Sequence, residues 1–551
     1  MKKTFILNVF FLALFIAIPS VQYAQNMETQ IDQLMNDQYQ NDNFGATILV
    51  AKEGKVVFRK AYGKANTEFN IDMIPENVFE IGSITKQFTA VGILMLLEEG
   101  KLSLDDEITK YIPDYPTQDT KITIHHLLTH TSGIKSYTSI PSLREFARKD
   151  LLVTELIDAF KDEPMDFKPN EQFRYNNSGY VLLGYIIEKI SGSSYGEFIQ
   201  KRIFDKLNMN SSHYGSKSKI IKNRAYGYQE RENEYRNADY ISMTIPYAAG
   251  SIMSTVDDLL KWNTAIRNHK LISKESTKKA FTNYKINNGN NINYGYGWFT
   301  HKIKDVPVIE HGGGIFGYTT QGIYVPSENA YIIILTNCDC VSPTNVAYKI
   351  AAITIGKTYL KASDAIKLSK EKLQKWVGAY KFDDGSTRFI TLKGKQLFSQ
   401  RLDSNSKFKI YPTSENSFFF DDSFAELIFS DETKKQAIFR DNRVELEGVW
   451  SNEKMPEPKK EVQLSKETLK KYIGTYELAP NFFIEITVEG NQIFGQATNQ
   501  SKVEMFAESE DNFFLKVVPA TITFEIDETT KLPISLTLSQ GGGETKGKKI
   551  K

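Results

Sequence analysis

The sequence predicts an α/β protein: an α/β/α sandwich with an antiparallel sheet and a helical insertion, followed by two small antiparallel β-barrels. Three observations support this fold. Strand-like runs occur near the start and again near residue 330, on either side of a long section rich in helices and loops. An apolar run from Ile84 to Leu97 predicts a buried helix. Beyond residue 365 the chain changes to short β runs with many aromatic residues.

The first half of the predicted sheet lies near the N-terminus. Residues 27–39 have the pattern of a polar amphipathic helix, and residues 45–51 and 55–62 form strand-like runs joined by a hairpin turn. The helix from Ile84 follows, and Gly100 can end it. The section from 100 to 300 forms the helical insertion.

The second half of the predicted sheet returns late in the domain. Strands are expected over 306–310, 318–325 and 330–336, and Pro343 opens a helix that runs to about 355. Two early and three late strands imply one antiparallel sheet closed by distant segments. Helices from both ends of this domain should cover one face, and the region around Ser83 the other.

An internal repeat with a constant offset of 96 positions follows. Residues 373–380 match 469–476, residues 390–400 match 486–496, and Asn416 and Phe418 match Asn512 and Phe514. We expect one β-barrel over 365–455 and a second over 462–551, with their aromatic residues in the cores rather than in a ligand site.

The overall composition gives no sign of a nucleic-acid partner. The 551 residues contain 68 Lys and Arg against 67 Asp and Glu, and the basic residues form no long block. A chain of this length also predicts several domains.

The N-terminus has the pattern of a signal peptide. Lys2 and Lys3 precede an apolar run from Phe5 to Ile18, which is short for a membrane span. We expect residues 1–25 to be removed and the protein to be exported, to a bacterial periplasm or outside the cell. The alternative is an uncleaved anchor. After removal of this segment we expect no integral membrane span.

Cys338 and Cys340 are the only cysteines. If the strand before them continued, they would lie on one of its faces, where a bridge across one residue would be strained. A metal site would need more ligands nearby. We therefore expect two thiols that fill the core.

The motif Ser83-Ile-Thr-Lys86 begins the buried helix, so the serine and the lysine lie on one helix face. The serine would lie near the unpaired N–H groups of the helix start, with an ammonium or a neutral amine one turn deeper. This arrangement suits a nucleophile that accepts an acyl group. The alternative is a helix cap followed by a solvated lysine.

Two further motifs follow in the chain. Tyr175-Asn-Asn177 precedes an apolar helix, and His311-Gly-Gly313-Gly314 ends a predicted strand. Separately, the first could be a helix cap and the second a bulge or flexible turn.

In this order, the three motifs resemble those of the serine β-lactamase and penicillin-binding protein superfamily. The branch with class C β-lactamases, DD-peptidases, esterases and D-aminopeptidases is the most similar. The supporting stretches are 79–86, 122–133, 173–179 and 250–259. The resemblance implies a hydrolase domain over 26–360, and the repeats resemble the lipocalin-like domains often fused behind such enzymes.

The resemblance also implies roles for the motif residues. Ser83 would be the nucleophile and Lys86 its electrostatic partner or proton relay. Tyr175 would be the general base and then the acid, and Asn177 would bind the acyl side-chain amide. The N–H groups of Ser83 and Gly314 would form the oxyanion hole. This chemistry needs a lysine and a tyrosine whose pKa values are lowered by their proximity.

The sequence departs from the family at His311, where many relatives have a lysine that binds the substrate carboxylate. A histidine is mostly neutral at pH 7 and binds anions more weakly. This difference disfavours efficient β-lactamase activity. His126 and His130 have the spacing of a metal pair, but the family uses this stretch for packing, so we expect no metal and no cofactor.

We therefore expect an exported serine hydrolase that acts through an acyl-Ser83 intermediate on small esters, amides or D-amino-acid peptides. The alternatives are a penicillin- or cell-wall-peptide-binding protein with DD-carboxypeptidase or weak β-lactamase activity, or an inactive binder.

Overall fold

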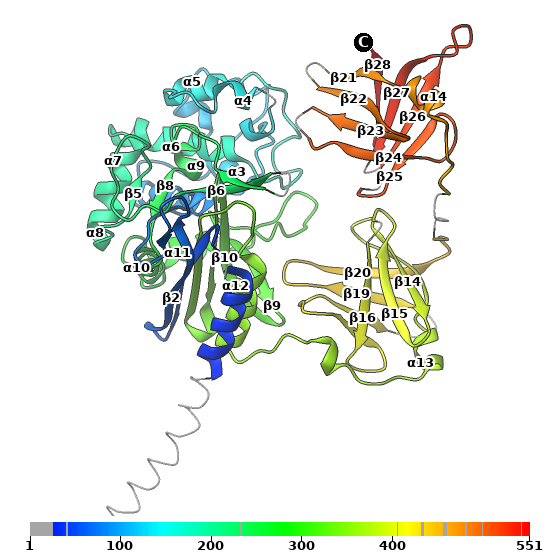
Figure 1. Cartoon of the computed structure of the whole chain (residues 1–551). Coiled ribbons are helices and arrows are strands. Elements are labelled where there is room, and N and C mark those ends of the chain that lie inside the picture. Colours follow the sequence, from blue (N-terminus) through cyan, green and yellow to red (C-terminus); the bar gives the residue numbers. More distant parts are fainter. Residues whose placement is uncertain are drawn as a thin grey trace, which may run out of the picture. The chain divides into compact units, whose positions relative to one another are not determined.

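A computed structural model describes residues 26–551 except 40–41, 141, 232–233, 405, 431–434, 456–459, 480–481, 499, 519 and 541–542. The expected signal peptide over 1–25 lies outside these residues. The chain divides into two compact units between Thr358 and Tyr359 (Figure 1). In the described part of the chain, no helix has the length and apolar character needed to cross a membrane.

An antiparallel sheet forms the centre of the first unit, in the order β3-β2-β1-β12-β11-β10-β9. Its strands are β1 (Gly45–Lys52), β2 (Lys55–Asn66), β3 (Ile71–Asp72), β9 (Phe299–Ile303), β10 (Val306–Ile315), β11 (Tyr318–Val325) and β12 (Ala330–Thr336). β1 pairs with β12, where Ile48 lies opposite Ile334 and Leu49 opposite Ile333. Both strands are buried on both faces, which explains their nearly continuous apolar sequences. The predicted sheet closed by distant segments is confirmed.

Helices cover both faces of this sheet (Figure 1). The helix over residues 26–39 lies beside α12 (Thr344–Thr354) on one face. On the other face, α2 (Thr85–Glu98) and α10 (Val256–Arg267) share a core with Leu49 and Ile333 of the sheet. Residues 85–96 of α2 are all buried, so the helix that carries Lys86 lies inside the domain.

The predicted insertion is a mainly helical region between β3 and β9. Its helices are α3 (Ile124–Leu128), α4 (Leu143–Phe146), α5 (Val153–Asp158), α6 (Asn177–Ser191), α7 (Tyr195–Ile199), α8 (Asp205–Leu207), α9 (Tyr247–Gly250), α10 and α11 (Lys274–Ala280), besides α2. Two small antiparallel sheets accompany them: β4 (Phe79–Glu80), β8 (Ile252–Ser254) and β5 (His213–Tyr214) form one, and β6 (Tyr228–Arg231) and β7 (Glu234–Asn237) form the other.

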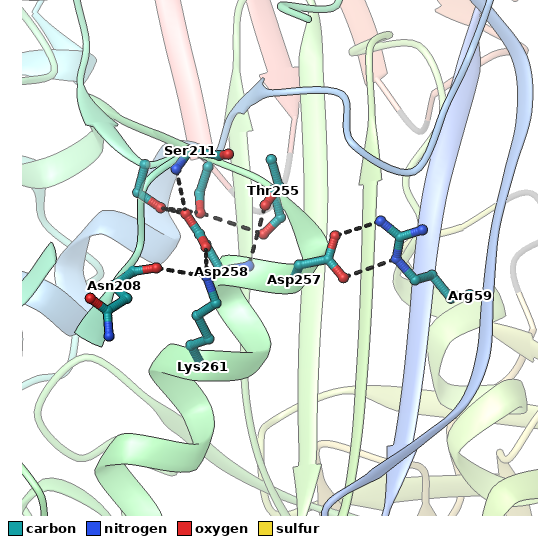
Figure 2. A network of polar contacts seen from close by, with 9 residues as sticks. Arg59, Asn208, Ser211, Thr255, Asp257, Asp258 and Lys261 are labelled. Carbon is teal, nitrogen blue, oxygen red and sulfur yellow. Dashed lines mark hydrogen bonds and ion pairs between the residues drawn. The ribbon is translucent and has the colours of Figure 1, made fainter.

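A polar network fixes the start of α10 (Figure 2). Thr255 caps the helix by accepting the Asp258 N–H at 3.2 Å. The Asp258 side chain is only 3% exposed, and its carboxylate accepts hydrogen bonds from Ser211 N at 2.9 Å, Ser212 Oγ at 2.9 Å and Lys261 Nζ at 2.7 Å. A buried carboxylate with this many donors is well compensated for its loss of water.

The same helix start is tied to the sheet. Asp257 forms a two-point ion pair with Arg59 of β2, at 2.7 and 2.9 Å (Figure 2). β8 leads directly into this region and pairs with β4, and β4 leads into the segment that carries Ser83. The network therefore helps to hold β4 and β8 in place, and with them the segment that carries Ser83.

The expectation of two free thiols is wrong. Cys338 and Cys340 form a disulfide, with their Cα atoms 5.2 Å apart. β12 ends at Thr336, and the chain turns after Cys338 instead of continuing as a strand. An extended strand would hold these residues roughly 6.6 Å apart, so the turn is what brings the sulfur atoms together.

The second unit contains two closed antiparallel barrels in which each strand pairs with the next along the chain. The first has β13 (Gly378–Phe382), β14 (Thr387–Lys393), β15 (Gln396–Arg401), β16 (Lys407–Pro412), β17 (Ser417–Phe420), β18 (Glu426–Ser430), β19 (Gln436–Arg440) and β20 (Glu445–Ser451), preceded by α13 (Lys370–Gln374). The second has β21 (Gly474–Ala479), β22 (Phe482–Glu489), β23 (Gln492–Ala497), β24 (Val503–Ala507), β25 (Asn512–Leu515), β26 (Ala520–Ile526), β27 (Pro533–Gln540) and β28 (Gly543–Lys549), preceded by α14 (Lys466–Lys470).

Aromatic side chains fill both barrels. Trp376 and Phe429 stack in the core of the first, and Tyr472 and Phe524 pack together in the core of the second. The predicted pair of β-barrels with aromatic cores is confirmed.

Candidate active site

Ser83 lies in a single 3₁₀ turn, η1 (Gly82–Ile84), between β4 and α2. Gly82 has φ +51°, a conformation that favours glycine, and a Cβ atom there would lie 2.8 Å from Gly314 N of β10. Thr320 of β11 donates a hydrogen bond to the Ile81 carbonyl at 3.1 Å. These contacts press the turn with Ser83 against the β10–β11 part of the sheet.

Lys86 is the centre of the hydrogen-bond network at the site. Its side chain is fully buried, and Nζ donates to Ser83 Oγ at 3.0 Å, Asn177 Oδ1 at 2.8 Å and the Ala249 carbonyl at 2.9 Å. All three acceptors are uncharged oxygen atoms. The structure thus brings Ser83, Lys86 and Asn177 together, as the motif order implied.

The electrostatic state of Lys86 follows from this environment. No carboxylate forms an ion pair with it within the described residues. Burial therefore dominates and lowers the pKa of Lys86 well below its usual value. A lysine with a lowered pKa has a larger neutral fraction near pH 7, and its free lone pair can then accept a proton.

Tyr175 lies beside Lys86, but not as the sequence implied. Lys86 Nζ is 4.8 Å from the centre of the Tyr175 ring, and the ring packs near His130 and Phe299. The Tyr175 hydroxyl is buried and makes no well-formed hydrogen bond to another described residue. Burial raises the pKa of Tyr175, and the nearby Ser83 hydroxyl offsets this only in part. The expected lowering of the tyrosine pKa is therefore wrong, because the aromatic surroundings disfavour a phenolate.

The start of α6 holds Asn177 in place. Asn176 caps this helix by accepting the Gly179 N–H at 2.7 Å, and its own N–H donates to His130 Nδ1 at 3.0 Å. Asn177 Nδ2 donates to Thr138 Oγ1 at 3.0 Å. With Lys86 on its carbonyl oxygen, Asn177 thus links the lysine to the loop that carries Thr138.

His311 does not end a strand, as the sequence suggested, but lies inside β10, which continues to Ile315. It is 2% exposed, and its Nε2 lies 3.1 Å from the Tyr294 hydroxyl while its Nδ1 faces the Gly312 carbonyl. Burial and the positive charge of Lys86 lower the pKa of His311 to about 4. His311 is therefore neutral near pH 7 and does not supply a cation at this position.

The glycines after His311 let β10 run along the turn with Ser83. β9 pairs with β10 only as far as Glu310, so the later part of β10 lies next to η1 instead of another strand. A Cβ atom at Gly313 would lie 2.1 Å from the Ile81 carbonyl, whereas a Cβ atom at Gly314 would meet nothing within 4 Å. Gly313 thus allows the close approach, and Gly314 borders open space beside Ser83.

The comparison with known families agrees with this geometry. A family model described as Beta-lactamase matches residues 26–353, more than half of the chain. The chain belongs to the Beta-lactamase family. The resemblance inferred from the motifs is thereby confirmed. As a member of this family with the Ser83 motif, the protein is a serine hydrolase. A second model, described as a domain of unknown function (DUF3471), matches residues 458–547.

Several relatives resemble this Beta-lactamase family member over most of its length. Penicillin-binding protein 4* of Bacillus subtilis is 29% identical over 446 residues, which cover 76% of this chain and 98% of the relative. Protein flp of Staphylococcus aureus is 30% identical, over 56% of this chain and 63% of its own. The structure of an octameric penicillin-binding protein homologue from Pyrococcus abyssi matches with 28% identity and a TM-score of 0.53, over 77% of this chain and 99% of that one. D-amino acid amidase from Ochrobactrum anthropi, at 22% identity and a TM-score of 0.53, shares the fold.

A pocket of about 130 Å³ opens beside Ser83 in this family member. Five separate segments line it: Gly82 and Ser83; Tyr137, Thr138 and Leu143; Asn177; Ile241, Ile245, Pro246, Ala249 and Gly250; and Gly314, Ile315 and Phe316. No lysine, arginine, histidine or acidic side chain is among these described lining residues. The space next to the serine is therefore mainly apolar.

Sequence reasoning missed several of these positions. The Ala249 carbonyl that accepts from Lys86 and the apolar lining residues Ile241 and Ile245 belong to no motif. In the sequence, these residues are distinguished only because they lie shortly before the 250–259 stretch, and this position does not show which of their atoms face the site. His126 takes part in the cap of α3, and His130 accepts the Asn176 N–H. Among the described residues no group of three or more metal-ligating side chains gathers.

Proposed function

We propose that this protein hydrolyses small uncharged esters and amides with an apolar acyl group through an acyl-Ser83 intermediate. The observation that carries the proposal is the apolar pocket beside a serine that is hydrogen-bonded to a buried lysine. Neutral His311 and the lack of a cation among the described lining residues disfavour substrates that carry a carboxylate next to the scissile bond.

In the acylation step, Ser83 Oγ attacks the substrate carbonyl while its proton passes to the lone pair of neutral Lys86 Nζ, 3.0 Å away. The carbonyl oxygen becomes an oxyanion that the N–H groups of Ser83 and Gly314 stabilise. The tetrahedral intermediate then collapses, and the bond to the alcohol or amine breaks. The leaving group takes up the proton from Lys86, directly or through the Tyr175 hydroxyl.

In the deacylation step, water attacks the carbonyl carbon of the acyl-Ser83 ester while it gives a proton to Lys86 Nζ. The tetrahedral intermediate collapses, the bond to Ser83 Oγ breaks, Ser83 Oγ takes the proton from Lys86, and the acid leaves. Because burial keeps Tyr175 protonated, we assign it the role of proton donor rather than first base. Asn177 holds the lysine, and its amide group lies where the acyl side chain would enter.

We also propose that the protein is exported, on the basis of the basic and apolar pattern of residues 1–25. N-terminal sequencing of the mature protein from its native host tests this. A mature chain that begins near residue 26 supports export, and a chain that retains its first residues contradicts a cleaved signal.

A substrate panel tests the activity. It compares p-nitrophenyl acetate and butyrate with a D-phenylalanine amide, a D-alanyl-D-alanine peptide and nitrocefin, with Ser83→Ala as the control. We expect kcat/KM to be at least tenfold higher for the neutral esters than for the two carboxylate-bearing substrates, and no turnover by Ser83→Ala. A preference for the peptide or for nitrocefin would instead support a penicillin-binding or β-lactamase activity.

A further inference from the structure

The first C-terminal barrel contains a buried arginine that forms no ion pair with any acidic side chain among the described residues. Arg388 of β14 is only 8% exposed, and its Nε makes no hydrogen bond to any described residue. Its guanidinium lies over the ring of Phe439, 3.8 Å from the ring centre. A buried charge without a counter-charge is costly, and proteins normally pair it. The barrel therefore holds a cation that its own described side chains do not neutralise.

Nearby carboxylates do not satisfy this arginine. Asp384, Asp403 and Asp441 act on Arg388 electrostatically, yet each accepts its hydrogen bonds elsewhere. Asp403 in particular binds Arg401 at two points, at 2.7 and 2.8 Å. Burial, together with the charge of Arg401, lowers the pKa of Arg388 to about 10, so the group is still charged near pH 7.

Two further polar residues share the inner face of the barrel with Arg388. In the β14–β15 register Arg388 lies opposite Arg401, and Ile390 lies opposite Ser399. Because side chains alternate along a strand, Arg388, Ser399 and Arg401 share the face of the buried Ile390. Ser399 is 1% exposed, and its Oγ has no hydrogen-bond partner among the described residues. Asp403 already offsets the charge of Arg401, so Arg388 is the arginine of this pair whose charge has no acidic partner among the described side chains.

The second barrel shows that this polar set is not needed to build the fold. At the repeat offset of 96 positions, its residues are Ile484, Gly495 and Ala497. Ile484 lies opposite Ala497 and Ile486 opposite Gly495, the same register as in the first barrel. One barrel thus closes with small and apolar residues at the three positions where the other has two arginines and a serine.

Aromatic rings connect this arginine to the surface. Phe439 packs against Phe420 at 6.1 Å, and Phe420 packs against Phe408 at 6.4 Å between ring centres. Phe408 is 55% exposed, which is unusual for a ring that adjoins a barrel core. A molecule that reached Arg388 along these rings would place an apolar body against them.

We propose that the first barrel binds an amphiphile with an anionic head group, a carboxylate or a phosphate, held by Arg388 and Ser399. The guanidinium fork matches either oxyanion with two parallel hydrogen bonds. The apolar part of the ligand lies along Phe408, Phe420 and Phe439. This proposal does not depend on the hydrolysis proposed at Ser83.

Isothermal titration of the full-length protein with decanoate, decyl phosphate and decanol tests the proposal. We expect one site that binds at least one of the two anions at least tenfold more tightly than decanol, and the better anion identifies the head group. The triple variant Arg388→Ile, Ser399→Gly, Arg401→Ala, which carries the residues of the second barrel, should bind that anion at least tenfold more weakly. Lys409→Leu, which removes a charge from the outer face of the same barrel, should leave the affinity unchanged.

Two results would overturn the proposal: decanol binding as tightly as both anions, or full anion affinity in the triple variant. Anion bound in the apolar pocket beside Ser83 would survive the triple substitution, so the experiment separates the two sites. Circular dichroism checks that the variant is folded. If it is not, Arg388→Lys replaces it: this variant keeps the charge but loses the fork, and should bind the anion at least threefold more weakly. Unchanged affinity in Arg388→Lys would contradict the two-point contact.

Discussion

The contact between β10 and the turn with Ser83 gives a prediction that depends on Gly313. A methyl group at Gly313 would lie 2.1 Å from the Ile81 carbonyl and 2.4 Å from Thr320 Oγ1. Ordinary contact begins near 3.4 Å, so Gly313→Ala must push Ile81, and with it Ser83, away by more than 1 Å. A displacement of about 1 Å at a catalytic group costs on the order of 10²-fold in rate, and overpacking of this kind costs about 1–3 kcal/mol of stability.

Gly543→Ala is the control, because a Cβ atom there meets only the Gln540 carbonyl, at an ordinary 3.7 Å, and the residue lies in the second barrel. We expect kcat/KM for p-nitrophenyl acetate to fall on the order of 10²-fold in Gly313→Ala and to stay within about threefold of wild type in Gly543→Ala. Thermal melting checks that both variants are folded at the assay temperature. Equal losses in the two variants, or wild-type activity in Gly313→Ala, would refute the argument that Gly313 sets the position of Ser83.

Three further predictions concern Lys86, Tyr175 and the start of α10. Because the pKa of Lys86 is lowered in the folded state, the unfolded chain binds more protons than the folded chain between that lowered value and 10.5. The free energy of unfolding of wild type, measured by urea titration, should therefore rise relative to that of Lys86→Met between pH 7 and pH 10. A constant difference between the two proteins over this pH range would contradict this. Tyr175→Phe should lower kcat for p-nitrophenyl acetate about 10²-fold with little change in melting temperature, and unchanged turnover would remove the hydroxyl from the mechanism. Asp258→Ala leaves buried donors unpaired and should lower the free energy of unfolding in urea by about 2–4 kcal/mol. Asp257 is more exposed, so Asp257→Ala should lower it by about 1 kcal/mol or less. A larger loss in Asp257→Ala than in Asp258→Ala would argue against the network in Figure 2.

Much of the fold was predictable, because the central strands and the repeat leave direct traces in the sequence. β1 and β12 are buried on both faces and so read as continuous apolar runs. The constant offset of 96 positions predicts two similar domains, and the structure contains two closed barrels there. The disulfide was missed because it depends on where β12 ends. The turn after Cys338 shortens the distance between the Cα atoms of Cys338 and Cys340, and no residue pattern in the sequence predicts that turn.

The candidate site was predictable in its residues but not in its electrostatics. The motif order placed Ser83, Lys86 and Asn177 in one site, and their hydrogen bonds now connect them. The pKa of Tyr175 depends on rings from distant segments, such as His130 and Phe299, which surround it only in the folded chain. For the same reason no motif predicted the apolar lining of the pocket, such as Tyr137, Ile241 and Ile245, because these side chains meet only in the folded chain.

Covalent trapping tests the central claim, that Ser83 is the nucleophile, most directly. The full-length protein is treated with a fluorophosphonate, and intact mass and peptide mapping locate the adduct. We predict one label per chain, on the peptide that contains Ser83, and none on Ser83→Ala, while Lys86→Met is labelled at least about 10²-fold more slowly. A label on another residue, or labelling of Ser83→Ala at the wild-type rate, would contradict the account.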